Sequence, residues 1–139
     1  MKFLQLAPFG LVVSLSLIAG AASSATAADD EPPKRRPGLW RITTISPDIG
    51  MRINEVCIEA GDSIIGALDG NCAKPSVAHA KDQTIVSIEC GSKDSREITS
   101  LLFTGDFQSW YRAQARMSAK GAHKGFTIDA KFLSERCMR

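Results

Sequence analysis

The residues of this chain best suited to chemistry are its four cysteines, at positions 57, 72, 90 and 137. Consecutive cysteines are 15, 18 and 47 residues apart. A structural zinc site usually draws on closely spaced CxxC-like pairs, which this spacing does not provide. An even number of cysteines in a short chain is instead typical of disulfides formed in an oxidising compartment. We therefore expect Cys57, Cys72, Cys90 and Cys137 to form two disulfides, and we expect no metal site and no cysteine nucleophile.

The pairing of these cysteines follows from a predicted β-hairpin. Cys72 and Cys90 lie nine residues on either side of Lys81, which falls near the turn. Antiparallel partners can be about 5.5 Å apart, a spacing that suits a disulfide. The hairpin favours Cys72–Cys90 and so leaves Cys57 with Cys137, while the other two connectivities stay open. In the chain-entropy treatment, the short and the long crosslink stabilise the fold by about 3 and roughly 4 to 5 kcal/mol.

The sequence offers little else for catalysis. It contains no GxSxG, HExxH, P-loop or Rossmann pattern. His79 and His123 fall near predicted turns, and a shared metal site would require them to converge. The carboxylates of Asp48 and Glu55 could act as a glycosidase pair only at the right separation. We therefore expect no catalytic residue and no cofactor, with a small hydrolase as the less favoured alternative.

The N-terminal residues 1–28 predict a secretory signal peptide. Lys2 supplies a positive charge, residues 3–22 are mostly apolar, and Ala25–Ala27 form a small-x-small cleavage motif. A retained membrane anchor is the alternative, because a spanning helix needs about 20 apolar residues. A proline and two glycines weaken that span. We expect a secreted, periplasmic protein with no integral membrane span after cleavage.

The remaining chain predicts one small domain with balanced charge. Removal of Lys2 leaves 16 basic against 15 acidic residues, so no strong field attracts nucleic acid. Residues 29–37 form a Pro-rich leader whose basic run, Lys34–Arg36, is expected to be flexible and solvated. Residues 38–139 have the size of a single β domain.

Alternation of apolar and polar residues predicts the fold class. We expect an all-β domain, either a small antiparallel β-barrel or a strongly curved sheet of about seven strands, stapled by disulfides. One short helix is expected over Glu59–Leu68, between a possible cap at Asp62 or Ser63 and a stop at Asp69–Asn71. The clearest predicted strands are 39–46, 51–58, 84–90, 96–104, 108–119 and 126–133.

Two faces of the predicted sheet could bind a partner. The inward positions include Trp40, Tyr111, Met117 and Phe126, which either line a pocket for a small apolar ligand or simply fill the core. On the outward face, aromatic and Arg side chains alternate with the inward ones and suggest a protein interface. This outward stripe consists of Trp110, Arg112 and Arg116. A solvated strand face explains the stripe equally well.

A family resemblance is carried by the motif Pro37–Trp40 at the start of a strand. It continues through a second strand ending in a cysteine at Val56–Ile58, a Cys-to-Cys hairpin, the turn Thr104–Phe107 and a last cysteine. In this order the chain resembles the domain-of-unknown-function family 3617, whose members are small exported bacterial proteins. The resemblance implies a signal-bearing, periplasmic, all-β domain and carries over no activity. This chain departs from the family in having Arg41 after the Trp and a short turn at 46–50.

These observations predict a non-catalytic binding or envelope-associated module. Its partner would be an unknown protein or a small apolar ligand, and not nucleic acid. The alternative is a protein-binding inhibitor of an envelope enzyme.

Overall fold

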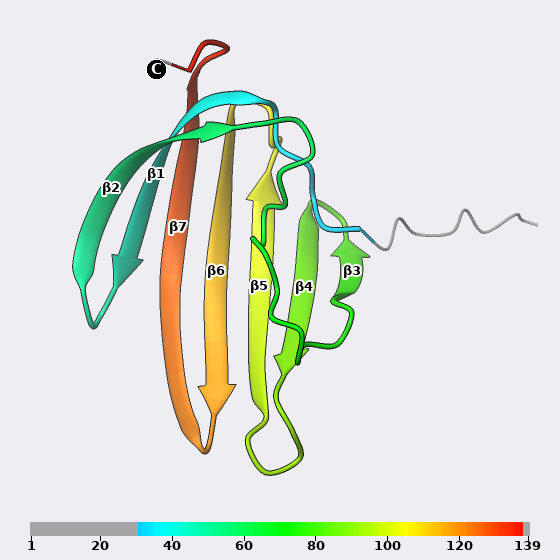
Figure 1. Cartoon of the computed structure of the whole chain (residues 1–139). Helices are drawn as coiled ribbons and strands as arrows, with labels where there is room; N and C mark the ends of the chain where they lie inside the picture. The colour runs from blue at the N-terminus through cyan, green and yellow to red at the C-terminus, as the bar shows by residue number, and fades with distance from the viewer. Residues whose placement is uncertain (1–30, 138–139) are drawn as a thin grey trace, which may run out of the picture.

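The computed structural model describes residues 31–137, so the predicted signal peptide lies outside the described part. These residues form one antiparallel sheet of seven strands, in the order β2-β1-β7-β6-β5-β4-β3 (Figure 1). No helix occurs between residues 31 and 137, and hence none there that could cross a membrane. The strands are β1 (Gly38–Ser46), β2 (Gly50–Ile58), β3 (Ser76–Ala80), β4 (Gln83–Cys90), β5 (Glu97–Gly105), β6 (Trp110–Ala119) and β7 (Ala122–Ser134).

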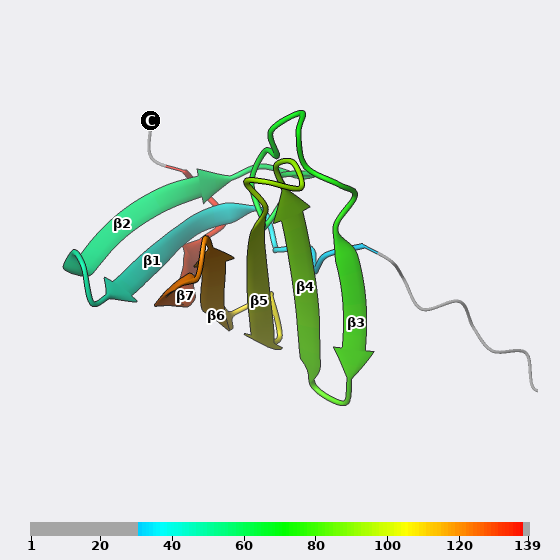
Figure 2. The same cartoon turned by 90° about the horizontal axis from the view of Figure 1, so that it is seen from below.

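The sheet is curved but open. Strands β3 to β7 form a meander, and the β1–β2 hairpin joins it because β1 pairs antiparallel with β7. Figure 2 shows β2 and β3 at the two ends of the curved sheet. The expected seven antiparallel strands are therefore confirmed, whereas the barrel alternative is wrong. The two end strands do not pair with each other, so the sheet is not closed.

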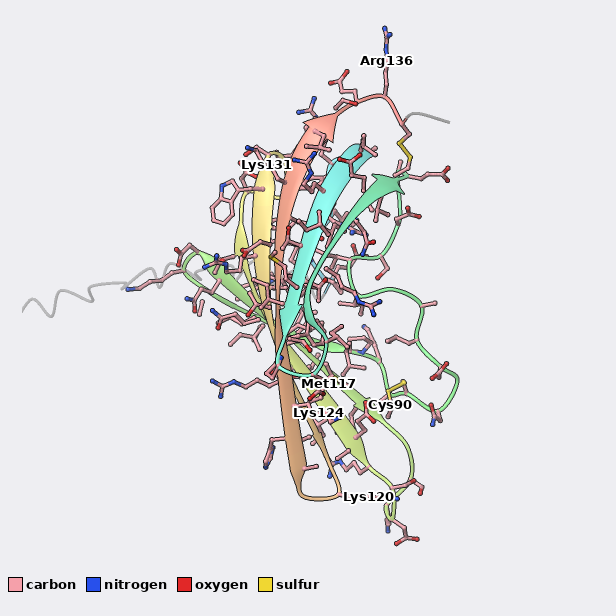
Figure 3. All side chains as sticks on the ribbon, turned by 90° about the vertical axis from the view of Figure 1, so that its left-hand side faces the viewer. Cys90, Met117, Lys120, Lys124, Lys131 and Arg136 are labelled. Atoms are coloured by element: carbon pink, nitrogen blue, oxygen red, sulfur yellow. A yellow bond between two sulfur atoms is a disulfide. The ribbon has the colours of Figure 1, made fainter. Side chains whose placement is uncertain are left out.

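The concave face carries the core. On β6, Tyr111, Ala113 and Ala115 are buried, and the alternate residues are exposed, as the period of two predicts. Cross-strand pairing places buried residues of neighbouring strands on the same side, for example Phe103 beside Ala113. Figure 3 shows Lys131 on the side opposite to the β2–β3 connection, whereas Cys90 lies on the side of that connection.

The expected helix over Glu59–Leu68 is wrong. Residues 59–75 instead form a loop that crosses the concave face in front of β4 and β5 (Figure 1). Gly61 and Gly66 have φ angles of 91° and 75°, in the left-handed region that interrupts a right-handed helix. The apolar residues whose spacing suggested a helix belong to the loop, and two of them, Ile64 and Ile65, pack against the core from there.

The two favoured disulfides are present. Cys57 and Cys137 link the end of β2 to the chain after β7, with a Cα–Cα distance of 5.6 Å. Cys72 and Cys90 link the loop to the end of β4. Because Cys57 precedes the 59–75 loop and Cys72 lies near its end, both ends of the loop are covalently fixed to the sheet.

The Pro37–Trp40 motif has a steric explanation. Gly38 has a φ of 135°, and a Cβ atom there would lie 2.5 Å from the Ser134 carbonyl oxygen. Two residues further on, Trp40 is fully buried and donates its indole N–H to the Arg36 carbonyl at 2.8 Å. The glycine therefore allows β1 to approach the end of β7 closely enough to bury the tryptophan.

We predict that Gly38→Ala lowers the free energy of unfolding by about 2 kcal/mol or more, because the new methyl group clashes and the φ angle is strained. Gly70→Ala is the matched control, since a Cβ there would have no neighbour within 4 Å. Its effect should stay within about 1 kcal/mol. Urea unfolding monitored by tryptophan fluorescence measures both. Equal effects of the two substitutions would contradict the steric account.

Candidate ligand-binding site

A cavity of about 390 Å³ lies between the concave face and the 59–75 loop. Ligand pockets in proteins are usually about 300 to 1,000 Å³ and mostly apolar. The wall of this cavity is largely hydrocarbon, with Asp69 and Thr99 as the polar exceptions besides the Tyr111 hydroxyl. Other hollows, of about 480 to 590 Å³, are bordered mainly by exposed or half-buried residues of the outer face and the leader. The cavity under the loop is also open to solvent, but it differs from these because buried core residues such as Leu101 and Phe103 form one of its walls.

Small residues occupy the middle of β6. Ala113 and Ala115 lie between the larger Tyr111 and Met117 on the concave side. Ala113 borders the cavity but is 1% exposed, so neighbouring side chains cover most of it. The loop contributes Ile64, Ile65 and Leu68 to the opposite wall.

Three of the four residues proposed as ligand-lining border this cavity. Tyr111, Met117 and Phe126 form part of its wall. Trp40 does not, since it is 0% exposed and packs in the core against Tyr111 and Phe132, with ring centroids 5.5 Å away in each case. The sequence reasoning missed the loop's contribution because it assigned these residues to a helix. It also missed Ala113, which is a small residue, like Ala115, on the same face as Tyr111 and Met117.

The basic run of the leader is held against the domain. Arg35 donates from Nη1 to the Tyr111 hydroxyl at 3.4 Å and from Nη2 to the Ser63 carbonyl at 3.1 Å. The Arg36 guanidinium lies 4.2 Å above the Phe132 ring and also pairs with Glu135. Arg35 and Arg36 therefore contact the domain, although the Arg36 side chain is still 38% exposed.

A turn between β5 and β6 sets the position of Tyr111. The Asp106 carboxylate accepts the backbone N–H groups of Gln108, Ser109 and Trp110 at 2.9, 2.7 and 3.0 Å, and also the Ser109 hydroxyl. The hydroxyl hydrogen bond, followed by the backbone ones, lowers the pKa of Asp106 far below its usual value. The turn presents Phe107, whose ring stacks on Tyr111 at 5.7 Å between centroids.

The proposed outer binding surface lies on one face, as alternation predicts. Trp110 is 50% exposed, and Arg112 and Arg116 are exposed beside it on β6. Arg112 is partly engaged, since its Nε donates to Asp129 at 2.6 Å. That hydrogen bond and the charge of Asp129 raise the pKa of Arg112.

The histidines do not converge. His79 lies on β3 with Nδ1 3.1 Å from the Thr84 hydroxyl, whereas His123 lies on β7, with three strands between. Among residues 31–137, no group of three or more His, Cys, Asp or Glu side chains is placed to hold a metal ion. Asp48 and Glu55 form ion pairs with separate cations, Lys124 and Arg41, at 3.3 and 2.8 Å.

We predict that Asp106 contributes to the acid sensitivity of the fold. Its folded-state pKa lies below the ordinary value of 3.8, so its stabilisation is fully present above about pH 4 and is lost as the pH falls through the lower folded pKa. Asp106→Asn cannot ionise, so the free energy of unfolding should fall less between pH 4 and pH 2 than in the unsubstituted protein. Asp94→Asn, in the exposed β4–β5 loop, should keep the original pH slope. A slope in Asp106→Asn parallel to that of the unsubstituted protein would refute the role of this carboxylate.

Comparison with known proteins gives one family match. A family model described as protein of unknown function (DUF3617) matches residues 35–137. No curated protein and no solved structure matches the chain. The matched segment contains the Gly38 and Trp40 contacts, the Asp106 turn and all four cysteines. With 103 of 139 residues matched (137 − 35 + 1), the chain belongs to the DUF3617 family of proteins of unknown function.

Proposed function

We propose that this protein is an exported, non-catalytic module that binds a small apolar ligand under the 59–75 loop. The observation that carries the proposal is the cavity of about 390 Å³, which is open to solvent and has core side chains in one wall. Apolar surface that stays in contact with water in such a cavity is unfavourable. An apolar ligand would cover this surface and would contribute about 25 cal/mol for each Å² of apolar surface removed from water.

The construction of the loop supports ligand entry. Residues 59–71 are held by isolated turns, such as the Gly66 N–H to Ser63 carbonyl hydrogen bond of 3.2 Å, and they belong to no strand. The disulfides of Cys57 and Cys72 fix the two ends of this segment. The middle of the loop can therefore lift away from the sheet and return to the same place.

Placement in the periplasm is part of the same proposal. Both disulfides need an oxidising compartment, and the apolar N-terminus with its small-x-small motif is typical of an exported protein. The mostly hydrocarbon wall of the cavity favours binding over catalysis, so a small hydrolase remains the less favoured alternative.

The alternative role, inhibition of an envelope enzyme by protein contact, has its own supporting observation. Trp110 is 50% exposed on the outer face, beside Lys131 on β7 and on the same face as Arg112 and Arg116. Tryptophan and arginine are enriched at the centres of protein interfaces. Binding of an apolar ligand that depends on the concave face, and not on Trp110, would separate the two roles.

We predict that Ala113→Leu weakens binding of the neutral fluorescent probe N-phenyl-1-naphthylamine at least tenfold, because the larger side chain occupies the cavity. Ala78→Leu is the matched control, since Ala78 is exposed on β3 and lies outside the cavity wall. It should bind the probe as the unsubstituted protein does. Fluorescence titration measures the affinities, and urea unfolding checks that both variants fold. Unchanged probe binding by folded Ala113→Leu would refute the cavity as the binding site.

A further inference from the structure

Arg35 lies at the junction of the cavity and a second hollow. Its guanidinium contacts Tyr111, which borders the cavity, and the Ser63 carbonyl in the loop. The second hollow, of about 590 Å³, lies between the leader and residues 60–64 and includes Arg35 in its wall. Ile64 borders both spaces. A ligand that occupies the apolar cavity and extends past Ile64 would therefore meet this guanidinium.

The hydrogen bonding of Arg35 is incomplete. A guanidinium has five N–H donors, and the two contacts of Arg35 both go to neutral oxygens. Its Nε is shielded from solvent and has no hydrogen-bond partner. A shielded donor without a partner is destabilising, and a partly buried charge normally has a counter-ion.

Arg35 also differs from its neighbours in charge pairing. Lys34 pairs with Glu31 at 2.8 Å, and Arg36 pairs with Glu135. Within the described part of the chain, no carboxylate forms an ion pair with Arg35. The carboxylates of Glu31 and Asp62 border the second hollow, but they already contact Lys34 and the Glu59 N–H. Among residues 31–137, the charge of Arg35 therefore has no carboxylate partner, and an anionic ligand would supply one.

Building on the proposed apolar-ligand function, we infer that the ligand is an acyl chain with one anionic head group. The chain occupies the cavity, and the head binds Arg35. A guanidinium fork matches the geometry of a carboxylate or a phosphate, and its remaining N–H groups include Nε. The Tyr111 hydroxyl, when it accepts from Arg35, keeps its own proton to donate to the head group.

Entry of the head group requires a small movement. Nε is shielded in the closed arrangement, and the Arg35 contact with the Ser63 carbonyl joins the leader to the loop. Lifting the loop breaks this contact and frees Nη2 to bind the head group. The same movement opens the cavity to the acyl chain, so head and chain enter together.

The test compares three probes of equal chain length: dodecanoate, dodecyl phosphate and dodecanol, each titrated by displacement of N-phenyl-1-naphthylamine at pH 8. The unsubstituted protein should bind at least one anionic probe tenfold or more tightly than dodecanol, and the tighter of the two identifies the head group as carboxylate or phosphate. Arg35→Gln should abolish this preference, so that the affinity ratio of each anionic probe to dodecanol falls to about one. Lys34→Gln, an exposed neighbour with the same change of charge, should retain the preference.

Tyr111→Phe is the second variant, in case Arg35→Gln does not fold. It should reduce the ratio of anionic-probe affinity to dodecanol affinity several-fold. Equal binding of all three probes by the unsubstituted protein, or an anionic preference retained in folded Arg35→Gln, would overturn the inference and leave the apolar-ligand function standing. Failure of all three probes to bind would overturn both.

Discussion

The fold depends on the burial of Trp40 where the two ends of the domain meet. The indole N–H is satisfied by the Arg36 carbonyl, and the ring packs against Tyr111 and Phe132, on β6 and β7. A buried tryptophan removes about 150 to 250 Å² from water, which makes this contact a major part of a small core. The contact also requires the pairing of β1 with β7, which brings residues about 90 positions apart side by side. Gly38 makes this approach sterically possible.

The concave face is divided into a filled end and an unfilled middle. Aromatic rings of Trp40, Phe107, Tyr111 and Phe132 fill the end near the leader. The middle, which includes Ala113, borders the cavity under the loop. Tyr111 belongs to both regions, because its ring is held by the aromatic cluster while its hydroxyl reaches Arg35. Rigid aromatic packing can therefore hold the polar end of the binding site that we propose under the loop.

Much of the sheet was predictable because strands leave a local signature. The alternation on Trp110–Ala119 correctly separated buried from exposed residues, and the symmetry of Cys72 and Cys90 about Lys81 indicated their disulfide. The prediction of a helix over Glu59–Leu68 was based on the spacing of the apolar residues. It was wrong because Gly61 and Gly66 adopt left-handed φ angles, which the spacing does not reveal.

The candidate site was predictable only in part, because it is built from contacts between distant residues. Tyr111, Met117 and Phe126 were identified from strand alternation alone. The contact of Arg35 with Tyr111 spans 76 positions and has no local signature, and a charge run by itself indicates solvent exposure. Closure of the sheet is also a property of its two end strands, β2 and β3, and not of the residue pattern within any strand.

The most direct measurement of the central claim, that the space under the 59–75 loop holds a ligand, is native mass spectrometry. The protein would be purified without denaturation or delipidation and then measured again after addition of excess dodecanoate. We predict additional mass, either from a ligand acquired in the cell or from one bound dodecanoate per chain, which disappears on denaturation and is absent in Ala113→Leu. A mass equal to that of the oxidised chain alone in both samples would contradict the account.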